Sequence, residues 1–255
     1  MDIVDVLSVL FRWLHVVAGI LWIGLLYWFN FVNIPFGATM DGDTKKKVIP
    51  ELIPRALWSF RYGALYTYGL GLLLLMIVFY HGGLMFDQGV GGWGLPAYVM
   101  LAVTLLSFGW YDPIAKSGLG KDLRMMGIVG IIIVVGVTYL LMDWAQFSYR
   151  AYNIHIGAMF GTIMAANVWM RIWPCQKKVL DAMKAGTAPD PALVALVGQR
   201  SRHNTYLSVP LVWTMINAHT VVPGANSPLW LFGATIFGWF IVWRLYTLTS
   251  KVKGW

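Results

Sequence analysis

Four of the five histidines in this chain lie toward one end of long apolar segments, where an ionisable side chain is costly. They are His15, His81, His155 and His219. Ionisable residues inside a membrane usually mark a functional site, and imidazole is a common metal ligand. Four histidines at similar depth therefore predict a shared ligand, either a haem or another metal centre.

Helix geometry gives the expected depth of two of these histidines. A helix rises about 1.5 Å per residue, so the sixteen residues from Arg171 to His155 span about 24 Å. The seventeen residues from Arg202 to His219 span about 26 Å. His155 and His219 are thus the best depth-matched pair of candidate metal ligands.

The other three histidines have different expected roles. His15 lies in an aliphatic and aromatic run and is the third candidate metal ligand. His81 is twenty residues, or about 30 Å, beyond Arg61, so it is either a further cofactor-binding residue or an anchor at the membrane interface. His203 lies at the opposite end of the apolar segments, where a capping or structural role is expected.

Two arginines accompany the candidate ligands. Arg12 precedes His15 by three residues, so both lie on one helix face, and Arg150 precedes His155 by five. Arginine pairs well with carboxylates, so either residue could contact haem propionates or an anionic substrate. The alternative is that these side chains extend to the lipid headgroups.

The available ligands favour haem b as the cofactor. The single cysteine, Cys175, lies on the opposite side from the candidate ligands, and the chain has no Cys-x-x-Cys-His attachment motif for haem c. Two histidines on facing helices can supply both axial ligands of a b-type haem. Four histidines could instead hold copper or zinc. Carboxylates are scarce near the histidines, which disfavours a carboxylate-bridged iron centre.

The composition predicts an all-α integral membrane protein. The chain is 58% hydrophobic and 12% charged, with a mean hydropathy of +0.65. About 20 apolar residues are enough to cross a bilayer as a helix. We predict a single transmembrane domain over 1–255, a bundle of about seven helices with a cytoplasmic link at about 174–203. The spans are expected near 7–34, 61–81, 94–112, 125–143, 152–173, 204–220 and 229–249.

The distribution of charge predicts the orientation. Of the 19 lysines and arginines, all but Arg12 and Arg150 lie in the links on one side or at the C-terminus. Loops rich in lysine and arginine face the cytoplasm, which places the N-terminus outside and the C-terminus in the cytoplasm. The net charge of +8 is therefore interpreted as a determinant of topology beside anionic lipid and not as a nucleic-acid surface.

Three stretches resemble the membrane-embedded N-terminal domain of bacterial membrane-bound urate oxidase, also called urate hydroxylase. They are RWLHVVAGILWIG at 12–24, HIGAMFGTIMAAN at 155–167, and QRSRHNTYLSVP at 199–210 with its continuation to His219. The resemblance extends through nearly the whole chain. It implies a protein of the bacterial inner membrane that oxidises urate and passes electrons to a c-type cytochrome and not to oxygen.

The resemblance also carries over four histidines, each within a matching stretch: His15, His155, His203 and His219. In the fused form of the family a further helix leads to an external cytochrome c domain. No haem c motif follows the seventh expected span here. Any cytochrome partner is therefore expected to be a separate polypeptide, which leaves the substrate assignment open.

Three function classes remain to be separated. The first is a haem-binding oxidoreductase that passes electrons from a small reduced substrate, urate by resemblance, to a periplasmic c-type cytochrome. The second is a non-catalytic haem b subunit of a larger respiratory or photosynthetic membrane complex, docked against other redox subunits. The third is a transporter, which would be expected to place charged residues near the bilayer midplane. The ionisable residues here cluster near the two surfaces instead.

Overall fold

The computed structural model describes residues 2–219 and 226–252 as helices joined by short links. Lys253, one of the basic residues near the C-terminus, and position 220 of the sixth expected span lie outside the described residues. The elements, with π-helical turns written η, are α1 (Ile3–Tyr27), η1 (Trp28–Asn33), α2 (Ile34–Thr39), α3 (Gly42–Leu74), η2 (Leu75–His81), α4 (Leu95–Leu105), α5 (Phe108–Lys116), α6 (Gly118–Lys121), α7 (Leu123–Tyr139), η3 (Leu140–Trp144), α8 (Tyr149–Asn167), η4 (Val168–Ile172), α9 (Trp173–Lys184), α10 (Pro191–Asn217) and α11 (Pro228–Thr249).

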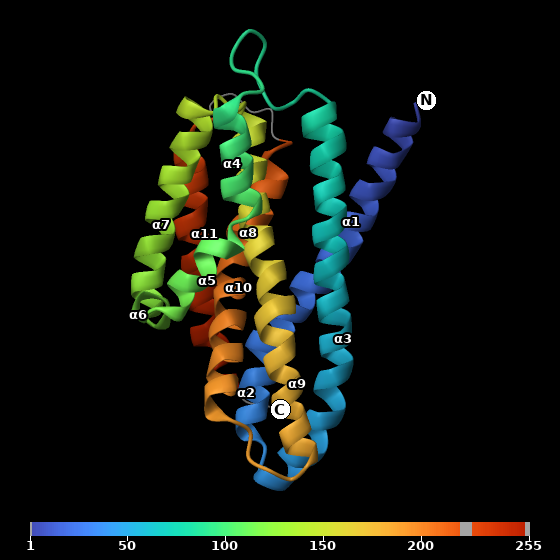
Figure 1. Cartoon of the computed structure of the whole chain (residues 1–255). Coiled ribbons are helices and arrows are strands. Elements are labelled where there is room, and N and C mark those ends of the chain that lie inside the picture. The colour runs from blue at the N-terminus through green and yellow to red at the C-terminus, as the bar shows by residue number, and fades with distance from the viewer. Residues whose placement is uncertain (1, 220–225, 253–255) are drawn as a thin grey trace.

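The long helices run side by side in one bundle (Figure 1). α1 and α3 pack along one side, α7 and α11 lie along the other, and α8 and α10 pack against each other between them. The N-terminus, the segment 82–94 and the start of α8 lie at one end of the bundle. The links from α2 to α3 and from α9 to α10 lie at the other end, as the expected alternation of spans requires.

Four helical segments are long and apolar enough to cross a membrane, and a bent pair of helices makes a fifth. The four are Ile3–Thr39, Gly42–His81, Leu123–Trp144 and Pro228–Thr249. The bent pair, α4 and α5, turns by 46° at the break after Leu105. The protein is therefore all-helical in its described residues and has four or five candidate membrane spans. The count of seven and the orientation stay predictions.

The two remaining long helices, α8 and α10, are not among these candidate spans, and α8 is enclosed by other helices. Most residues of α8 are buried, including Asn153, His155 and Asn167. A helix that is shielded from lipid does not need an apolar surface, provided that its polar groups find partners inside the protein. The hydropathy of a sequence window is therefore a poor predictor of whether these two helices cross the membrane.

The expected link at 174–203 is mostly helical. α9 continues from η4 as far as Lys184, and α10 begins at Pro191, where proline suits the first turn of a helix. Asp190 caps α10 by accepting a hydrogen bond from the Ala192 amide at 2.8 Å. The non-helical part of the link is only 185–190.

Helices α8 and α10 are in tight contact at Gly157. A Cβ atom at Gly157 would collide with Oγ1 of Thr214, a hydroxyl that donates a 2.7 Å hydrogen bond to the Leu211 carbonyl. A Cβ at Gly161, one turn further along, meets no atom within 4 Å. Gly157 and Gly161 are four residues apart and form a small-residue face on α8, and of the two only Gly157 is required by packing.

We expect Gly157→Ala to destabilise the protein. Alanine improves helix propensity by about 0.5–1 kcal/mol, but overpacking of a tight contact costs about 1–3 kcal/mol, so the net effect is a loss. Gly161→Ala is the matched control and is expected to be neutral or slightly stabilising. Thermal unfolding of the two variants in detergent measures the difference. An equal melting temperature for both would contradict the tight contact.

Candidate functional site

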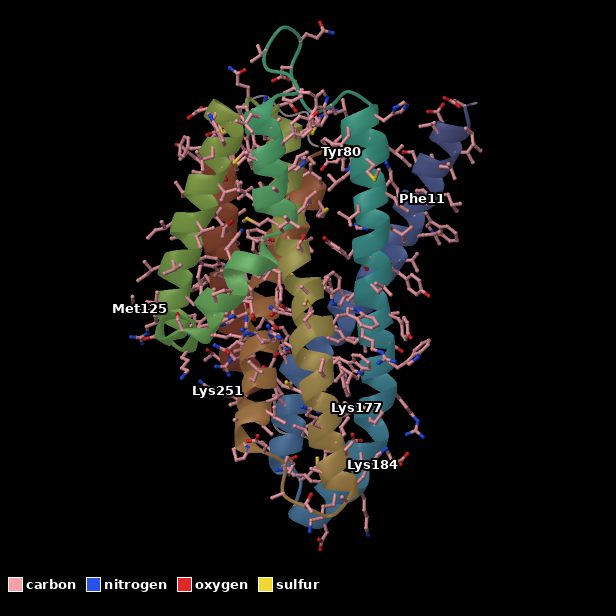
Figure 2. The ribbon with its side chains drawn as sticks, in the orientation of Figure 1. Phe11, Tyr80, Met125, Lys177, Lys184 and Lys251 are labelled. Atoms are coloured by element: carbon pink, nitrogen blue, oxygen red, sulfur yellow. The ribbon has the colours of Figure 1, made fainter. Side chains whose placement is uncertain are left out.

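The candidate residues lie on α1, η2 and α8 and just after α10, toward the end of the bundle where α8 begins. Figure 2 labels Phe11 on α1 and Tyr80 on η2 in this half of the molecule. Lys177 and Lys184 on α9 lie in the opposite half. The residues that could bind a cofactor are thus separated from the basic end of α9 by most of the length of the bundle.

His155 is the most completely enclosed of the candidate ligands. Its side chain is buried in α8, and its Nδ1 lies 2.7 Å from the carbonyl oxygen of Ala151. A carbonyl only accepts hydrogen bonds, so Nδ1 carries the proton and Nε2 carries the lone pair. The Tyr80 hydroxyl donates to Nε2 at 3.1 Å. The rings of Tyr80 and Phe147 flank the imidazole.

His15 has the same arrangement on a different helix. Its Nδ1 lies 2.8 Å from the Thr67 carbonyl oxygen of α3, so Nδ1 is again the donor. Gly71 provides the space for the ring, because a Cβ there would lie 3.0 Å from His15 Cε1. Nε2 of His15 forms no hydrogen bond with the described residues. In both imidazoles Nε2 is therefore the nitrogen that could bind a metal, although in His155 it accepts the Tyr80 hydrogen bond.

Arg12, Arg150 and His219 come from three separate parts of the chain and lie toward the same end of the bundle. His219 lies beyond the end of α10 and is exposed. Both arginines lie close enough to His219 to act on it electrostatically. Arg12 and Arg150 add positive charge at the end of the bundle where α1 and α8 begin, which favours an anionic ligand there.

His81 and His203 differ from the other histidines in their surroundings. His81 is exposed at the end of η2. His203 is buried near the middle of α10, and its Nδ1 lies 2.8 Å from the Tyr111 hydroxyl. Asn167 donates to the same hydroxyl at 3.1 Å and to Asn204 at 2.9 Å. His203 is thus part of a polar network between helices.

The structure does not gather three of these histidines around one point. Among residues 2–219 and 226–252, no group of three or more histidine, cysteine, aspartate or glutamate side chains could hold a metal ion. This arrangement gives no support to a copper or zinc centre with four histidine ligands. A haem needs only two axial imidazoles, so the geometry leaves that prediction open.

A buried charge cluster is the main feature that sequence reasoning missed. Asp112 has a side chain that is 8% exposed and forms ion pairs with Arg200 at 2.8 Å, Arg171 at 2.5 Å and Lys116 at 2.7 Å. Arg200 is fully buried, and its Nε and Nη1 have no partner among the described residues. The available signal was an aspartate inside an apolar segment, which predicts a paired charge but not the identity of its partners.

Comparisons with known proteins assign the family. The family model for the urate oxidase N-terminal domain matches residues 37–254. No curated protein and no solved structure gives a significant match to the chain. The match covers most of the chain and includes α8 and α10 with His155, His203 and His219. This chain belongs to the urate oxidase N-terminal family.

Proposed function

We propose that this protein is a haem-binding oxidoreductase of the bacterial inner membrane. It would pass electrons from a small reduced substrate, urate by family, to a separate periplasmic c-type cytochrome. The family and the apolar helices support a membrane oxidoreductase. The observation that supports haem binding is the tautomer of His155. This imidazole is buried, its Nδ1 donates to the Ala151 carbonyl, and its Nε2 keeps its lone pair.

The donor set fits a b-type haem. Metal-bound histidines usually donate their other ring nitrogen to a carbonyl or carboxylate, which fixes the ring and the tautomer. His155 and His15 both have this arrangement, through Ala151 and Thr67. A haem bound by these residues would supply one-electron transfer at its iron. Tyr80 would give up its hydrogen bond to His155, because its hydroxyl occupies the position next to Nε2.

The positive groups at the same end of the bundle suit the anionic part of such a site. Arg12 and Arg150 both lie close enough to His219 to act on it electrostatically. Arginine binds carboxylates and other planar anions through a rigid fork of N–H donors. We assign these arginines to the haem propionates or to the urate anion.

A second function is supported by the equivalence of His15 and His155. Two imidazoles with the same tautomer are the type of ligand found in a bis-histidine haem b, in which both axial positions are filled. No position would then remain open for a substrate. The protein would serve as a non-catalytic haem b subunit of a larger respiratory or photosynthetic complex.

The absorption spectrum of the purified protein, oxidised and then reduced with dithionite, tests both functions. We expect a haem Soret band that shifts on reduction. Urate added without oxygen should produce the same reduced spectrum, whereas xanthine should not. Reduction by dithionite but not by urate would favour the electron-transfer subunit. The absence of both a Soret band and bound iron would contradict both functions.

A further inference from the structure

Two cavities lie next to each other on the side of the bundle that contains α6, α7, α10 and α11. The apolar cavity, about 610 Å³, is lined mostly by aromatic and aliphatic side chains of α5, α7, α8, α10 and α11. The polar cavity, about 320 Å³, is lined by α6, the start of α7 and α10. Leu123 and His203 line both cavities, so the two adjoin. A ligand that fills both needs an apolar part and a polar part.

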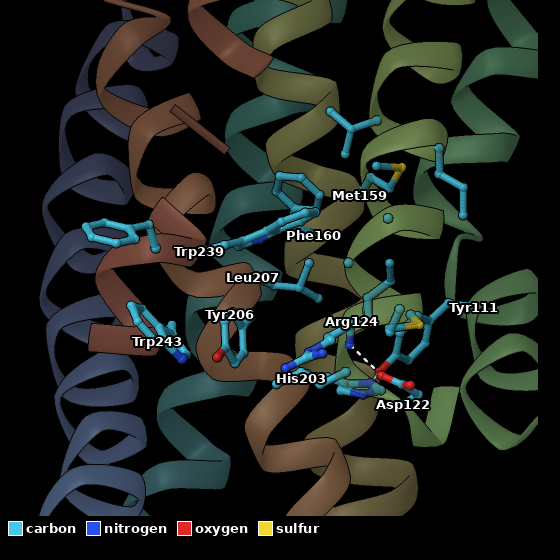
Figure 3. Close-up of a pocket in the computed structure, with 18 of the residues that line it drawn as sticks. Tyr111, Asp122, Arg124, Met159, Phe160, His203, Tyr206, Leu207, Trp239 and Trp243 are labelled. Carbon is cyan, nitrogen blue, oxygen red and sulfur yellow. Dashed lines mark hydrogen bonds between the residues drawn. The ribbon is translucent and has the colours of Figure 1, made fainter. Parts of the chain in front are cut away.

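The apolar cavity is open to the membrane-facing surface at its α11 wall. Phe240 and Trp243 line it and are 52% and 51% exposed. Trp239 and Phe160 lie toward one end of the cavity, and Arg124 lies at the other (Figure 3). The aromatic wall suits an acyl chain as well as any other apolar molecule. The choice of ligand therefore depends on the charged residues.

Three basic side chains line these cavities. Lys121 and Arg202 line the polar cavity, and Arg124 lines the apolar one. None of the three forms an ion pair with the described residues. Asp122 is the only acidic residue among the described residues that line either cavity, and its carboxylate accepts a hydrogen bond from the Arg124 amide at 2.8 Å. The charge around the two cavities is therefore positive on balance, which favours an anionic group.

Hydrogen bonds hold the walls of the polar cavity together. The Gln199 side-chain amide donates to the carbonyl oxygens of Ala115 and Gly120 at 2.9 and 2.7 Å, which ties the turn between α5 and α6 to α10. Lys121 directly follows Gly120, and Arg202 follows Gln199 by three residues on α10. The two cations of the polar cavity are thus carried by backbone segments that are fixed to each other.

The cations also lie at the depth that a lipid headgroup would occupy. Leu123 is the first residue of the candidate span Leu123–Trp144, and Lys121 and Arg124 are exposed on either side of it. Headgroup phosphates lie at the boundary between lipid and water, where they attract lysine and arginine. A headgroup site therefore requires exposed cations beside an apolar surface, which is the arrangement found here.

We propose that the two cavities together bind one anionic phospholipid from the membrane leaflet in which α7 begins. An acyl chain lies along the aromatic wall, and the phosphate binds at the three cations. A free phosphate would use only the polar cavity, and a neutral apolar molecule would use only the apolar one. An anionic phospholipid uses both. The proposal does not depend on the proposed function, because none of the candidate haem ligands His15, His155 and His219 lines either cavity.

Native mass spectrometry of the protein, titrated with phosphatidylglycerol in a non-ionic detergent, tests the proposal. We expect one lipid to bind about tenfold more tightly than phosphatidylcholine with the same acyl chains, since only the first carries net negative charge. A basic residue near an anionic lipid surface contributes a factor of about five, so loss of all three cations should lower the affinity about a hundredfold. The cation variant combines Lys121→Gln, Arg124→Gln and Arg202→Gln.

The matched control removes the same amount of charge from other exposed lysines. It combines Lys46→Gln, Lys47→Gln and Lys177→Gln, three exposed residues that line neither cavity. We expect this variant to bind phosphatidylglycerol like the parent protein. Equal affinity for the two lipids, or an equal loss in the two triple variants, would overturn the anionic site. Glycerol phosphate that binds as tightly as phosphatidylglycerol would overturn the lipid in favour of a free anion.

A second pair of variants tests the position of the acyl chain. Gly127 lines the apolar cavity, and a Cβ there would lie 4.0 Å from Trp239 Cζ3, which is an ordinary contact. Gly127→Leu should therefore fill part of the cavity and weaken phosphatidylglycerol binding. Gly136→Leu is the control on the same helix, because a Cβ at Gly136 meets no atom within 4 Å. Equal lipid affinity in these two variants would overturn the placement of the chain in this cavity.

Discussion

Replacing His155 with glycine is expected to abolish the haem spectrum of the purified protein, and imidazole added to the buffer is expected to restore it. The side chain is fully buried and presents Nε2 while Ala151 holds Nδ1. Glycine removes the ligand and leaves a space of the shape of the ring. Free imidazole can enter that space, which separates loss of a ligand from loss of the fold. Absorption spectra with and without imidazole provide the measurement.

Two further variants make this experiment specific. His81→Gly removes an exposed imidazole from the end of η2 and is expected to leave the spectrum unchanged. Tyr80→Phe removes the hydroxyl that donates to His155 Nε2 at 3.1 Å, so it should retain haem. A spectrum that survives in His155→Gly and disappears in His81→Gly would reverse the assignment of ligands.

The local features of the fold could be predicted from the sequence because they depend on neighbouring residues. The apolar runs that predict spans near 7–34 and 229–249 correspond to α1 with η1 and to α11. The orientation of the His155 ring also depends on a local contact, since its Nδ1 donates to the Ala151 carbonyl one helical turn away. Patterns of this kind repeat every three or four residues and can be recognised in a window of the chain.

The features that could not be predicted depend on residues far apart in the chain. Arg200 lies 88 residues from Asp112, and His203 lies 92 residues from Tyr111. The bend between α4 and α5 has the same origin, because Ser107 donates a 3.1 Å hydrogen bond to the Met159 carbonyl of α8. Neither proline nor glycine occupies the break at 106–107, so no helix-breaking residue in the sequence predicts the bend.

The second large effect is expected from Asp112→Asn. The carboxylate is the only anionic partner of Arg200 among the described residues, and Arg200 is fully buried. Removing one partner of a buried ion pair leaves an uncompensated charge and costs about 3–5 kcal/mol. Asparagine keeps the size of the side chain, so the loss would come from charge and not from a cavity. Unfolding by SDS titration in mixed micelles measures the change in free energy.

The matched control is another ion pair in which the acid lies on an exposed surface. Glu51 and Arg55 form a 2.9 Å pair on α3 with side chains that are 69% and 73% exposed, so Glu51→Gln is expected to cause no measurable change. Combining Asp112→Asn with Arg200→Met should recover part of the lost stability, because the buried charge is then removed from both sides. A double variant less stable than Asp112→Asn would mean that Arg200 contributes through its packing on Tyr111, 5.3 Å from the ring centre, more than through its charge.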